Sequence, residues 1–277
     1  MSFPVGGGEV CAGLPALIAG LLLAWYCRML LCRMGGETSG EESACLGLLR
    51  GMAAAVAHDF NNVLGSMTLF AQLLKGVRLD GEGACYLDNL LVSCRLGQNY
   101  TSNLQVFAGV RPYQPQKFPV GRLLDTVTPV LRLIMPDVVA VSFPEIDREL
   151  VIRGEQFLVE QAVINLALNS RDAMADGGSL EISCKRVARL PESPDAEEEG
   201  ARPAASAVLS VRDTGKGIDP GALERITDPF YTTKDSKGRI GLGLPVVRRI
   251  MEMHGGRLVV RSVPGRGTTV ELHFPLA

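Results

Sequence analysis

Residues 208–218 read VLSVRDTGKGI, an apolar run that ends at Asp213 and passes directly into two glycines. The apolar run predicts a buried strand, and a carboxylate at the end of a strand can accept a hydrogen bond from an exocyclic amine such as that of adenine. Gly215 and Gly217 allow the backbone to approach a flat ring closely. The stretch therefore predicts a nucleotide-binding edge of a sheet.

The segments around this stretch alternate between helical and strand patterns. We expect helices at 120–134, 156–175 and 246–254, and strands at 138–143, 179–185, 207–212, 258–262 and 268–274, the last two joined by a turn at Pro264-Gly265. This order predicts an α+β sandwich with helices on one face of a mixed sheet. Residues 193–205 are acidic and rich in proline, and we expect them to form a flexible excursion between two strands.

Further groups suited to phosphate follow the same order. Asn165 and Asn169 are four residues apart in a predicted helix, so both face one side, and an amide oxygen can join the octahedral shell of Mg²⁺. A helix that simply exposes two asparagines is the alternative. Gly241 and Gly243 precede a predicted helix, where free backbone N–H groups can bind phosphate. Residues 228–234 (DPFYTTK) place Lys234 beside an apolar anchor, as a mobile lid over polyphosphate requires.

The region before residue 110 carries a helical pattern instead. Apolar residues recur three or four apart along one stretch, namely Leu49, Met52, Val56, Phe60, Val63, Met67, Phe70 and Leu74. A turn at residues 80–83 separates it from a second helical stretch at 84–109, whose middle is polar. Two long helices joined by a short turn predict an antiparallel hairpin. Because a lone hairpin leaves its apolar seam half covered, we expect a homodimer that forms a four-helix bundle.

His58 lies between the seam positions Val56 and Phe60 and is therefore expected to point toward solvent. An exposed neutral imidazole is a competent nucleophile. Asp59 can hold one ring nitrogen and raise the nucleophilicity of the other, and Asn62, one turn later on the same face, can orient a water. Taken alone, a surface histidine on a helix is most often inert, so the interpretation depends on the other motifs.

Composition excludes some classes of function. The chain has 277 residues and a formal net charge of −2, which does not favour a nucleic-acid partner. Its seven cysteines are scattered without metal-ligand spacing, which indicates free thiols in a reducing compartment.

The amino terminus predicts a membrane anchor. Residues 10–27 are uncharged and almost wholly apolar, and the run extended to residue 32 reaches the roughly 20 residues that a bilayer-spanning helix needs. Arg28 and Arg33 follow the run and Glu9 precedes it, so the positive-inside rule places the remainder in the cytoplasm, behind a single-pass helix in the inner membrane. A cleaved signal peptide and a buried helix are the alternatives.

Taken in order, these motifs resemble those of the sensor histidine kinases of two-component systems. The phosphoacceptor box of that family resembles AHDFNN (57–62), in the form of the nitrogen-regulation subgroup, and its N box resembles NLALNSRDAM (165–174). The adenine box resembles DTGKGI, the F box DPFYTTK, the second glycine box GLGL, and the carboxy-terminal hairpin GGRLVVRSVPGRGTTVELHFP. The resemblance covers about residues 47–275.

The resemblance implies a domain organisation. After a tail (1–9), a transmembrane helix (10–32) and a linker (33–43), it implies a dimerisation and histidine phosphotransfer domain (44–110). A Bergerat-type (GHKL) ATP-binding domain (118–277) completes the chain. The implied activity is ATP-dependent phosphorylation of a histidine, followed by transfer to an aspartate of a response regulator receiver domain.

The resemblance also assigns roles to single residues. His58 is the implied phosphoacceptor, Asp59 the assisting carboxylate and Asn62 the residue that positions water. For ATP and Mg²⁺ the implied residues are the metal ligand Asn169 with Asn165 beside it, the adenine contact Asp213, the loop glycines Gly215, Gly217, Gly241 and Gly243, the lid residue Lys234, and Thr268 near the adenine pocket.

One position departs from the family pattern. Arg239 stands where the second glycine box usually begins with glycine, and this weakens the expectation of tight nucleotide binding. A nucleotide-weak phosphatase or adaptor that acts on a response regulator is therefore the alternative. A different GHKL ATPase is a further alternative, but such proteins lack a preceding hairpin that bears a histidine.

Overall fold

The computed structural model describes residues 39–77, 79–109, 113–187, 205–228, 231 and 241–276. Its internal contacts divide the chain into Met1–Ala53 and Ala54–Ala277, and only the helical course of residues 39–53 is described in the first unit. The predicted anchor at 10–32, most of the acidic excursion, Arg239 and Lys234 lie outside the described residues. Among the helices that the structure does describe, none has the length and apolar character needed to span a bilayer.

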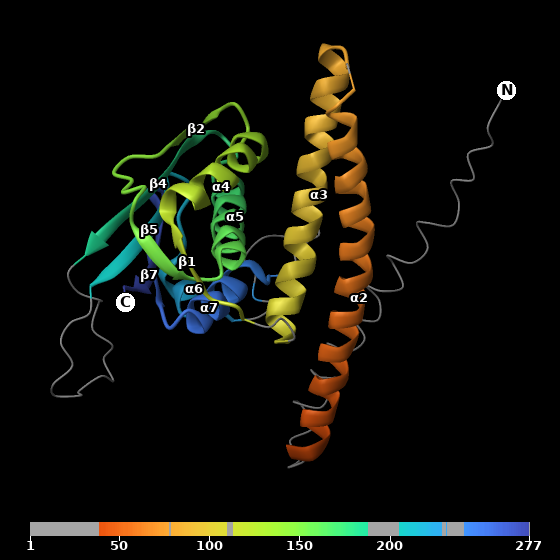
Figure 1. Cartoon of the computed structure of the whole chain (residues 1–277). Coiled ribbons are helices and arrows are strands. Elements are labelled where there is room, and N and C mark those ends of the chain that lie inside the picture. Colours follow the sequence, from red (N-terminus) through yellow and green to blue (C-terminus); the bar gives the residue numbers. More distant parts are fainter. Residues whose placement is uncertain are drawn as a thin grey trace. The chain divides into compact units, whose positions relative to one another are not determined.

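Two long helices form the amino-terminal hairpin (Figure 1). Helix α2 (Ser39–Leu74) begins inside the segment predicted as a linker, so that segment is shorter than expected. Helix α3 (Gly81–Ala108) is capped at its start by Asp80, whose side chain accepts a hydrogen bond from the Gly83 N–H, and it ends at Gly109 in the left-handed conformation. These two signals fix the ends of α3, and the start lies three residues before the predicted one.

The buried face of α2 differs from the predicted seam. Ala57 and Ala71 are fully buried, whereas Val63, Met67, Phe70 and Leu74 are 44–66% exposed. These apolar residues form a stripe that a single chain leaves largely exposed. A three-to-four spacing identifies an apolar stripe without saying which helix covers it.

The polar middle of α3 is buried as well. The Thr101 hydroxyl donates a hydrogen bond to the side-chain carbonyl of Asn61 on α2, and Asn99, Ser102 and Asn103 are buried beside it. A polar helix face that finds hydrogen-bond partners inside the molecule need not weaken the helix. On this face only the Asn99 side-chain nitrogen is buried without a partner among the described atoms. This explains why α3 runs unbroken through a stretch that reads as weakly helical.

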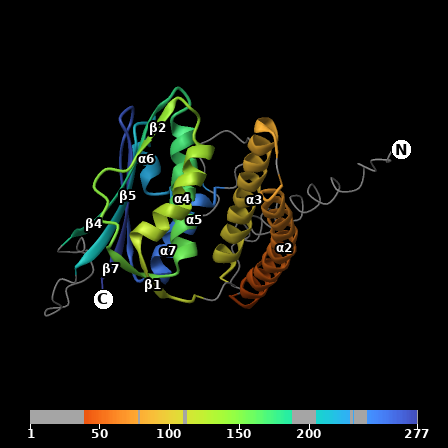
Figure 2. The ribbon, with the colours of Figure 1, turned by 45° about the horizontal axis from the view of Figure 1, so that its top comes forward.

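The carboxy-terminal part contains the predicted mixed sheet. Five strands lie in the order β2 (Val139–Ser142), β4 (Gly178–Val187), β5 (Ser206–Asp213), β7 (Gly267–Pro275) and β6 (Arg257–Val263). The β2–β4 pair is parallel and the other pairs are antiparallel. Helices α4 (Val120–Ile134), α5 (Gln156–Ala173) and α7 (Gly243–Met253) cover one face of this sheet (Figure 2). The predicted α+β sandwich is confirmed, with element ends shifted by a few residues.

Three short elements were not predicted. Strands β1 (Gln116–Pro119) and β3 (Val151–Gly154) pair antiparallel in a separate two-stranded sheet, and α6 (Pro220–Leu223) is a single turn. Four residues are too few for a periodic signal, so these elements depend on tertiary contacts. The core between helices and sheet is built from large, fully buried side chains, among them Leu123, Leu131, Leu158, Leu166, Leu180, Ile182, Leu209 and Phe274.

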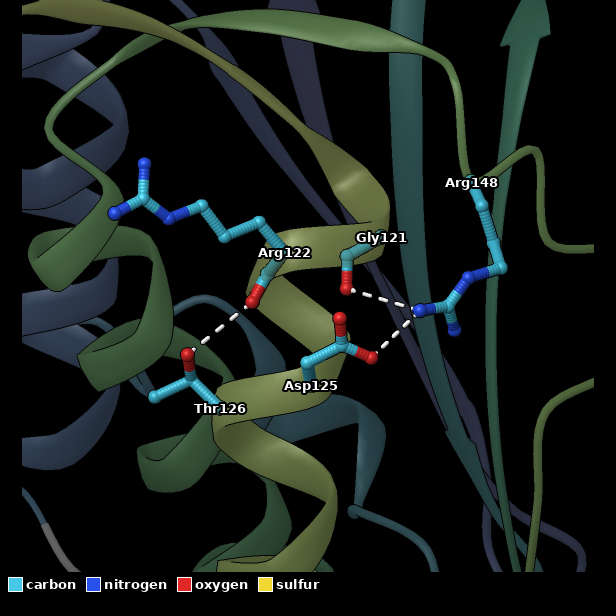
Figure 3. Close-up of polar contacts among 5 residues, drawn as sticks. All are labelled: Gly121, Arg122, Asp125, Thr126 and Arg148. Atoms are coloured by element: carbon cyan, nitrogen blue, oxygen red, sulfur yellow. Dashed lines mark hydrogen bonds and ion pairs between the residues drawn. The ribbon is translucent and has the colours of Figure 1, made fainter.

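The start of α4 is closed by a loop of the chain itself (Figure 3). The N–H groups of Val120 and Gly121 donate to the carbonyl oxygens of Leu150 and Arg148, at 2.9 and 2.8 Å. The Arg148 guanidinium reaches back to the Asp125 carboxylate at 2.6 Å and to the Gly121 carbonyl oxygen at 3.4 Å. The first N–H groups of α4 are thus occupied, and this helix start is not a phosphate site.

The cysteines of the described part are unpaired thiols. Cys94 and Cys184 are buried and Cys85 is exposed. Burial raises the pKa of Cys184 to about 12, with the nearby Asp147 adding to the effect. The Cys184 thiol therefore stays protonated and unreactive at neutral pH.

Candidate active site

Asp213 lies at the end of β5 and is held by three hydrogen bonds. Its Oδ1 accepts from the backbone N–H groups of Gly215 at 2.9 Å and Thr268 at 3.2 Å. Its Oδ2 accepts from the hydroxyl of Ser170 on α5 at 2.9 Å. The side chain is buried, so these bonds fix one orientation of an acceptor at the edge of the sheet.

The glycines after Asp213 allow close approach of two other segments. A Cβ added to Gly215 would lie 2.6 Å from the carbonyl oxygen of Ala173, at the end of α5. Gly217 has φ of 70°, and an added Cβ would overlap the carbonyl oxygen of Val263 at the end of β6. Only glycine fits both positions. The loop is thereby clamped between α5 and the β6–β7 turn.

The β6–β7 turn completes the support of Asp213. The Ser262 hydroxyl receives the Ile218 N–H at 2.8 Å and lies 2.9 Å from the hydroxyl of Thr268. Gly267, beside Thr268, has φ of 99°, and an added Cβ would overlap the Asp213 carbonyl oxygen. Thr268 therefore lies at Asp213 and contributes its backbone N–H.

Asn169 and the start of α7 lie together. A Cβ added to Gly243, the first residue of α7, would be 3.4 Å from the Asn169 side-chain nitrogen. The residue before it, Leu242, makes no side-chain capping bond, and Gly241 adopts φ of 67°. Among the described residues this helix start has no side-chain cap, and it presents the positive end of its dipole beside an amide side chain.

Asn165 faces a different neighbour. It is buried, and its amide exchanges two hydrogen bonds of 2.9 Å with the amide of Asn103 on α3. Asn103 also donates to Asn99 at 3.1 Å, one turn earlier on α3. The four-residue spacing suggested one shared face for Asn165 and Asn169, but their side chains meet different partners.

His58 lies on the exposed side of α2, as predicted. Its side chain is 72% exposed, and Asp59 is 83% exposed. The ring Nδ1 lies 3.3 Å from an Asp59 carboxylate oxygen and 3.4 Å from the Asn62 side-chain nitrogen. The three predicted residues therefore lie around one ring nitrogen.

The two contacts at Nδ1 require opposite tautomers. Toward Asp59, Nδ1 must carry the proton and donate it, which leaves Nε2 with a free lone pair. Toward Asn62, Nδ1 must be the acceptor, which places the proton on Nε2. The Asp59 contact therefore selects the form in which Nε2 is nucleophilic.

This chain is similar in sequence to several known proteins. Residues 154–277 match the family described as histidine kinase-, DNA gyrase B-, and HSP90-like ATPases. Sporulation kinase C of Bacillus subtilis (strain 168) is 30% identical over 243 residues, which are 87% of this chain and 52% of that protein. Sensor histidine kinase ZraS of Salmonella typhi is 27% identical over 275 residues, 96% of this chain and 55% of that protein. Residues 154–277 thus match that ATPase family, and the chain as a whole is similar to sensor histidine kinases.

The chain spans about half the length of those two relatives. Among solved structures, full-length ShkA in complex with AMPPNP matches 82% of this chain and 46% of its own, with a TM-score of 0.50 and 22% identity. That likeness establishes a shared fold. Membership of the nitrogen-regulation subgroup stays a prediction.

The donor set of this site fits a magnesium ion bound mainly by nucleotide. In the described residues no group of three or more histidine, cysteine or acidic side chains is placed to hold a metal. Asn169 offers one amide oxygen beside an uncapped helix start. Mg²⁺ keeps several waters and is commonly held by one or two protein groups together with substrate phosphates. One protein oxygen beside a helix N-terminus is compatible with that mode.

Two residues that support the elements of this site were not predicted from the sequence. Ser170 lies inside the N-box stretch, but nothing in its spacing indicates that its hydroxyl reaches Asp213. His254, the residue at the carboxy-terminal end of α7, is buried. Its Nδ1 lies 2.7 Å from the Ile250 carbonyl oxygen, and its Nε2 accepts the Glu155 N–H at 3.0 Å, tying the end of α7 to the start of α5. Burial lowers the pKa of His254, against the opposing effect of the bond to Ile250.

Proposed function

We propose that this protein is an ATP-dependent protein histidine kinase that phosphorylates His58 and passes the phosphoryl group to an aspartate of a response regulator receiver domain. The observation that carries the proposal is the pairing of an exposed imidazole, flanked by Asp59 and Asn62, with an ATPase-family domain in one chain. The domain supplies a binding edge for nucleotide, and the hairpin supplies the acceptor.

The chemical step follows from the tautomer that Asp59 selects. The Nε2 lone pair of His58 forms a bond to the γ-phosphorus of ATP, the bond from that phosphorus to the β–γ bridging oxygen breaks, and ADP leaves with the electron pair. The ring then loses its Nδ1 proton, for which Asp59 is the nearby acceptor at 3.3 Å. Positioning and charge stabilisation supply most of the rate enhancement in such transfers.

The nucleotide would lie between Asp213 and the start of α7. Asp213 offers an oriented acceptor to the adenine amino group, between the close-packed glycines Gly215 and Gly217. The uncapped start of α7 at Gly243 suits the phosphates. Asn169 would hold the Mg²⁺, which when bound neutralises phosphate charge. Lys234 is proposed as a lid residue from the sequence alone, and Asn165, committed to Asn103, is the weakest of the proposed nucleotide contacts.

A second copy of this chain is the proposed cover for the exposed stripe of α2. Val63, Met67 and Phe70 of α2 are 44–66% exposed. Leu90 and Tyr86 of α3 add exposed apolar surface. Aligned apolar side chains on a helical hairpin are buried by forming a four-helix bundle. Met67→Glu with Phe70→Glu should convert a dimer to a monomer in sedimentation, whereas Val151→Glu in the other part of the chain should not.

The apolar run at 10–32 is proposed to anchor the protein in the inner membrane, with the catalytic part in the cytoplasm. The proposal rests on the length of the run and on the arginines that follow it. Extraction tests it directly: the full chain should remain with membranes in alkaline carbonate and leave them in detergent. A chain lacking residues 10–32 should instead be released by carbonate.

Loss of labelling in one variant tests the central proposal. With ATP labelled at the γ-phosphate, the wild-type chain should acquire label that is stable to alkali and labile to acid, as expected of a phosphorus–nitrogen bond. His58→Gln should acquire none and still bind ADP, and ATP labelled at the α-phosphate should label neither protein. Persistent labelling of His58→Gln would show that another residue is the acceptor.

The second candidate function is a phosphatase or adaptor. Asn62 within 3.4 Å of the ring favours it, because an amide there can orient a water toward the aspartyl phosphate of a bound regulator. Arg239 in the glycine box points in the same direction, since it suggests weak nucleotide binding. A titration with ADP separates the two functions: no measurable binding to the wild-type chain would favour the second.

A further inference from the structure

The three hydrogen bonds to Asp213 divide its two oxygens unequally. Oδ1 receives two backbone N–H groups, from Gly215 and Thr268, whereas from the described residues Oδ2 receives only the Ser170 hydroxyl. A carboxylate oxygen has two lone pairs that accept hydrogen bonds. Oδ1 is therefore fully used, and the remaining acceptor position of Asp213 is on Oδ2, beside Ser170.

We propose that Ser170 is the positioning residue that presents Oδ2 of Asp213 to the 6-amino group of the nucleotide base and so sets the preference for adenine. The inference rests on the proposed nucleotide site and adds to it a residue and a reason for base selection. Ser170 is itself buried, at 4% exposure, so its hydroxyl is held in place and does not exchange its bond with water.

The geometry gives Ser170 two effects on base recognition. Its hydroxyl holds the carboxylate against rotation about the bond to Cβ, so that Oδ2 keeps one direction. By taking one lone pair of Oδ2, it leaves a single direction from which a base donor can approach. An amino group can donate there, whereas the 6-oxo group of hypoxanthine would bring two acceptors together.

Ser170 also links the two ends of the proposed site. It follows Asn169 directly on α5, so one helix places an amide beside the start of α7 and a hydroxyl on the carboxylate at the end of β5. Neighbouring residues of a helix point about 100° apart, which lets one segment reach both groups. A shift of α5 would therefore alter the phosphate and base contacts together.

The test compares two ligands that differ by one amino group. ADP and purine riboside 5′-diphosphate, which lacks the 6-amino group, are titrated into the full chain, so that no turnover complicates binding. Wild type should bind ADP about tenfold more tightly than the purine riboside analogue. Ser170→Ala should weaken ADP by about tenfold and leave the analogue within about twofold, so that the preference disappears.

Ser206→Ala is the matched control. It also deletes a buried serine hydroxyl, at the opposite end of β5 from Asp213. Among the described atoms the Ser206 hydroxyl oxygen has no hydrogen-bond partner. It should leave both affinities unchanged. Ser170→Cys, which retains a weak donor of similar size, should show an intermediate preference and serves as the second variant if Ser170→Ala does not fold.

Three results would contradict the assignment in distinguishable ways. Equal weakening of both ligands by Ser170→Ala, or no weakening of either, would show that Ser170 only fills space. An unchanged preference in Ser170→Cys would show the same if the alanine variant is unfolded. Failure of the wild-type chain to bind either ligand would instead overturn the nucleotide site on which the inference rests.

Discussion

The proposed phosphoacceptor region on α2 and the proposed nucleotide edge at Asp213 are built in opposite ways. His58 and Asp59 are 72% and 83% exposed, and the ring nitrogen between Asp59 and Asn62 has contacts of 3.3 and 3.4 Å. Asp213 is 6% exposed and takes three hydrogen bonds from α5, its own loop and β7. The region around His58 is open to solvent and its side chains make long contacts. The region around Asp213 is buried, and several hydrogen bonds fix its side chain.

The difference matches the demands on each region. The proposed phosphoacceptor must meet ATP and then a receiver domain, so it needs access from solvent and tolerance of different neighbours. The nucleotide edge meets one ligand, and fixed dipoles bind a ligand most strongly when they need no reorganisation. We therefore expect substitutions at Asp213 and its supports to affect folding and affinity, and substitutions near His58 to affect rate.

The largest expected effect is a loss of folding stability from a substitution in the buried region around Asp213. Gly267→Ala should lower the free energy of unfolding by about 4 kcal/mol, because the added Cβ overlaps the Asp213 carbonyl oxygen at a positive φ. Gly265→Ala is the matched control: it lies in the same turn with φ of 74° but has open space, so it should cost only about 1 kcal/mol. Urea unfolding of both variants measures the difference, and equal losses would show that the close approach at Gly267 is not a constraint.

The next effect concerns the open region alone. Asp59→Asn should slow autophosphorylation about hundredfold, since the amide neither takes the Nδ1 proton nor selects the Nε2 lone pair as strongly. Affinity for ADP should be unchanged, because Asp59 lies outside the nucleotide edge. Rates at saturating ATP test this, with Asn62→Ala expected to stay within a few-fold of wild type. If the Asp59→Asn variant keeps the wild-type rate, the Asp59 carboxylate has no role in the phosphoryl transfer.

A smaller effect separates support from binding at Asn165. Asn103→Leu leaves the Asn165 amide buried without its partner and should cost about 2 kcal/mol of stability. Replacing both by leucine should recover much of that loss, as a double-mutant cycle in urea can measure. If the double variant instead loses ADP affinity more than stability, Asn165 belongs to the nucleotide edge after all.

The smallest effect contrasts a buried imidazole with the exposed one. His254 is neutral in the folded protein, and its burial lowers its pKa from the ordinary 6.5. Below about pH 6.5 the unfolded chain binds more protons than the folded one, so stability is complete above that pH and falls as the pH decreases. The slope should approach about 1.4 kcal/mol per pH unit at most. His254→Gln should show a shallower fall between pH 7.5 and 5.5, and an unchanged slope in this variant would show that His254 does not carry the pH dependence.

Much of the fold was readable in the chain. Helix periods, strand runs and the turn at Pro264-Gly265 gave the order of the elements, because each is set by residues close together in sequence. The same was true of the local cluster formed by His58, Asp59 and Asn62, since residues four apart on a helix necessarily share a face. Four-residue strands such as β1 and β3 were missed because they pair across 31 or more intervening residues.

What only the tertiary structure decided is which group each side chain meets. The sequence by itself placed Asp213 at a strand end and glycines after it, but it could not show that Ser170, 43 residues away, holds one carboxylate oxygen. It could not separate Asn165 from Asn169, because periodicity gives a direction and not a partner. It named the apolar stripe on α2 without showing that a single chain leaves it exposed. Local patterns follow from backbone geometry, whereas contacts between distant segments depend on how helices and sheet pack around one core.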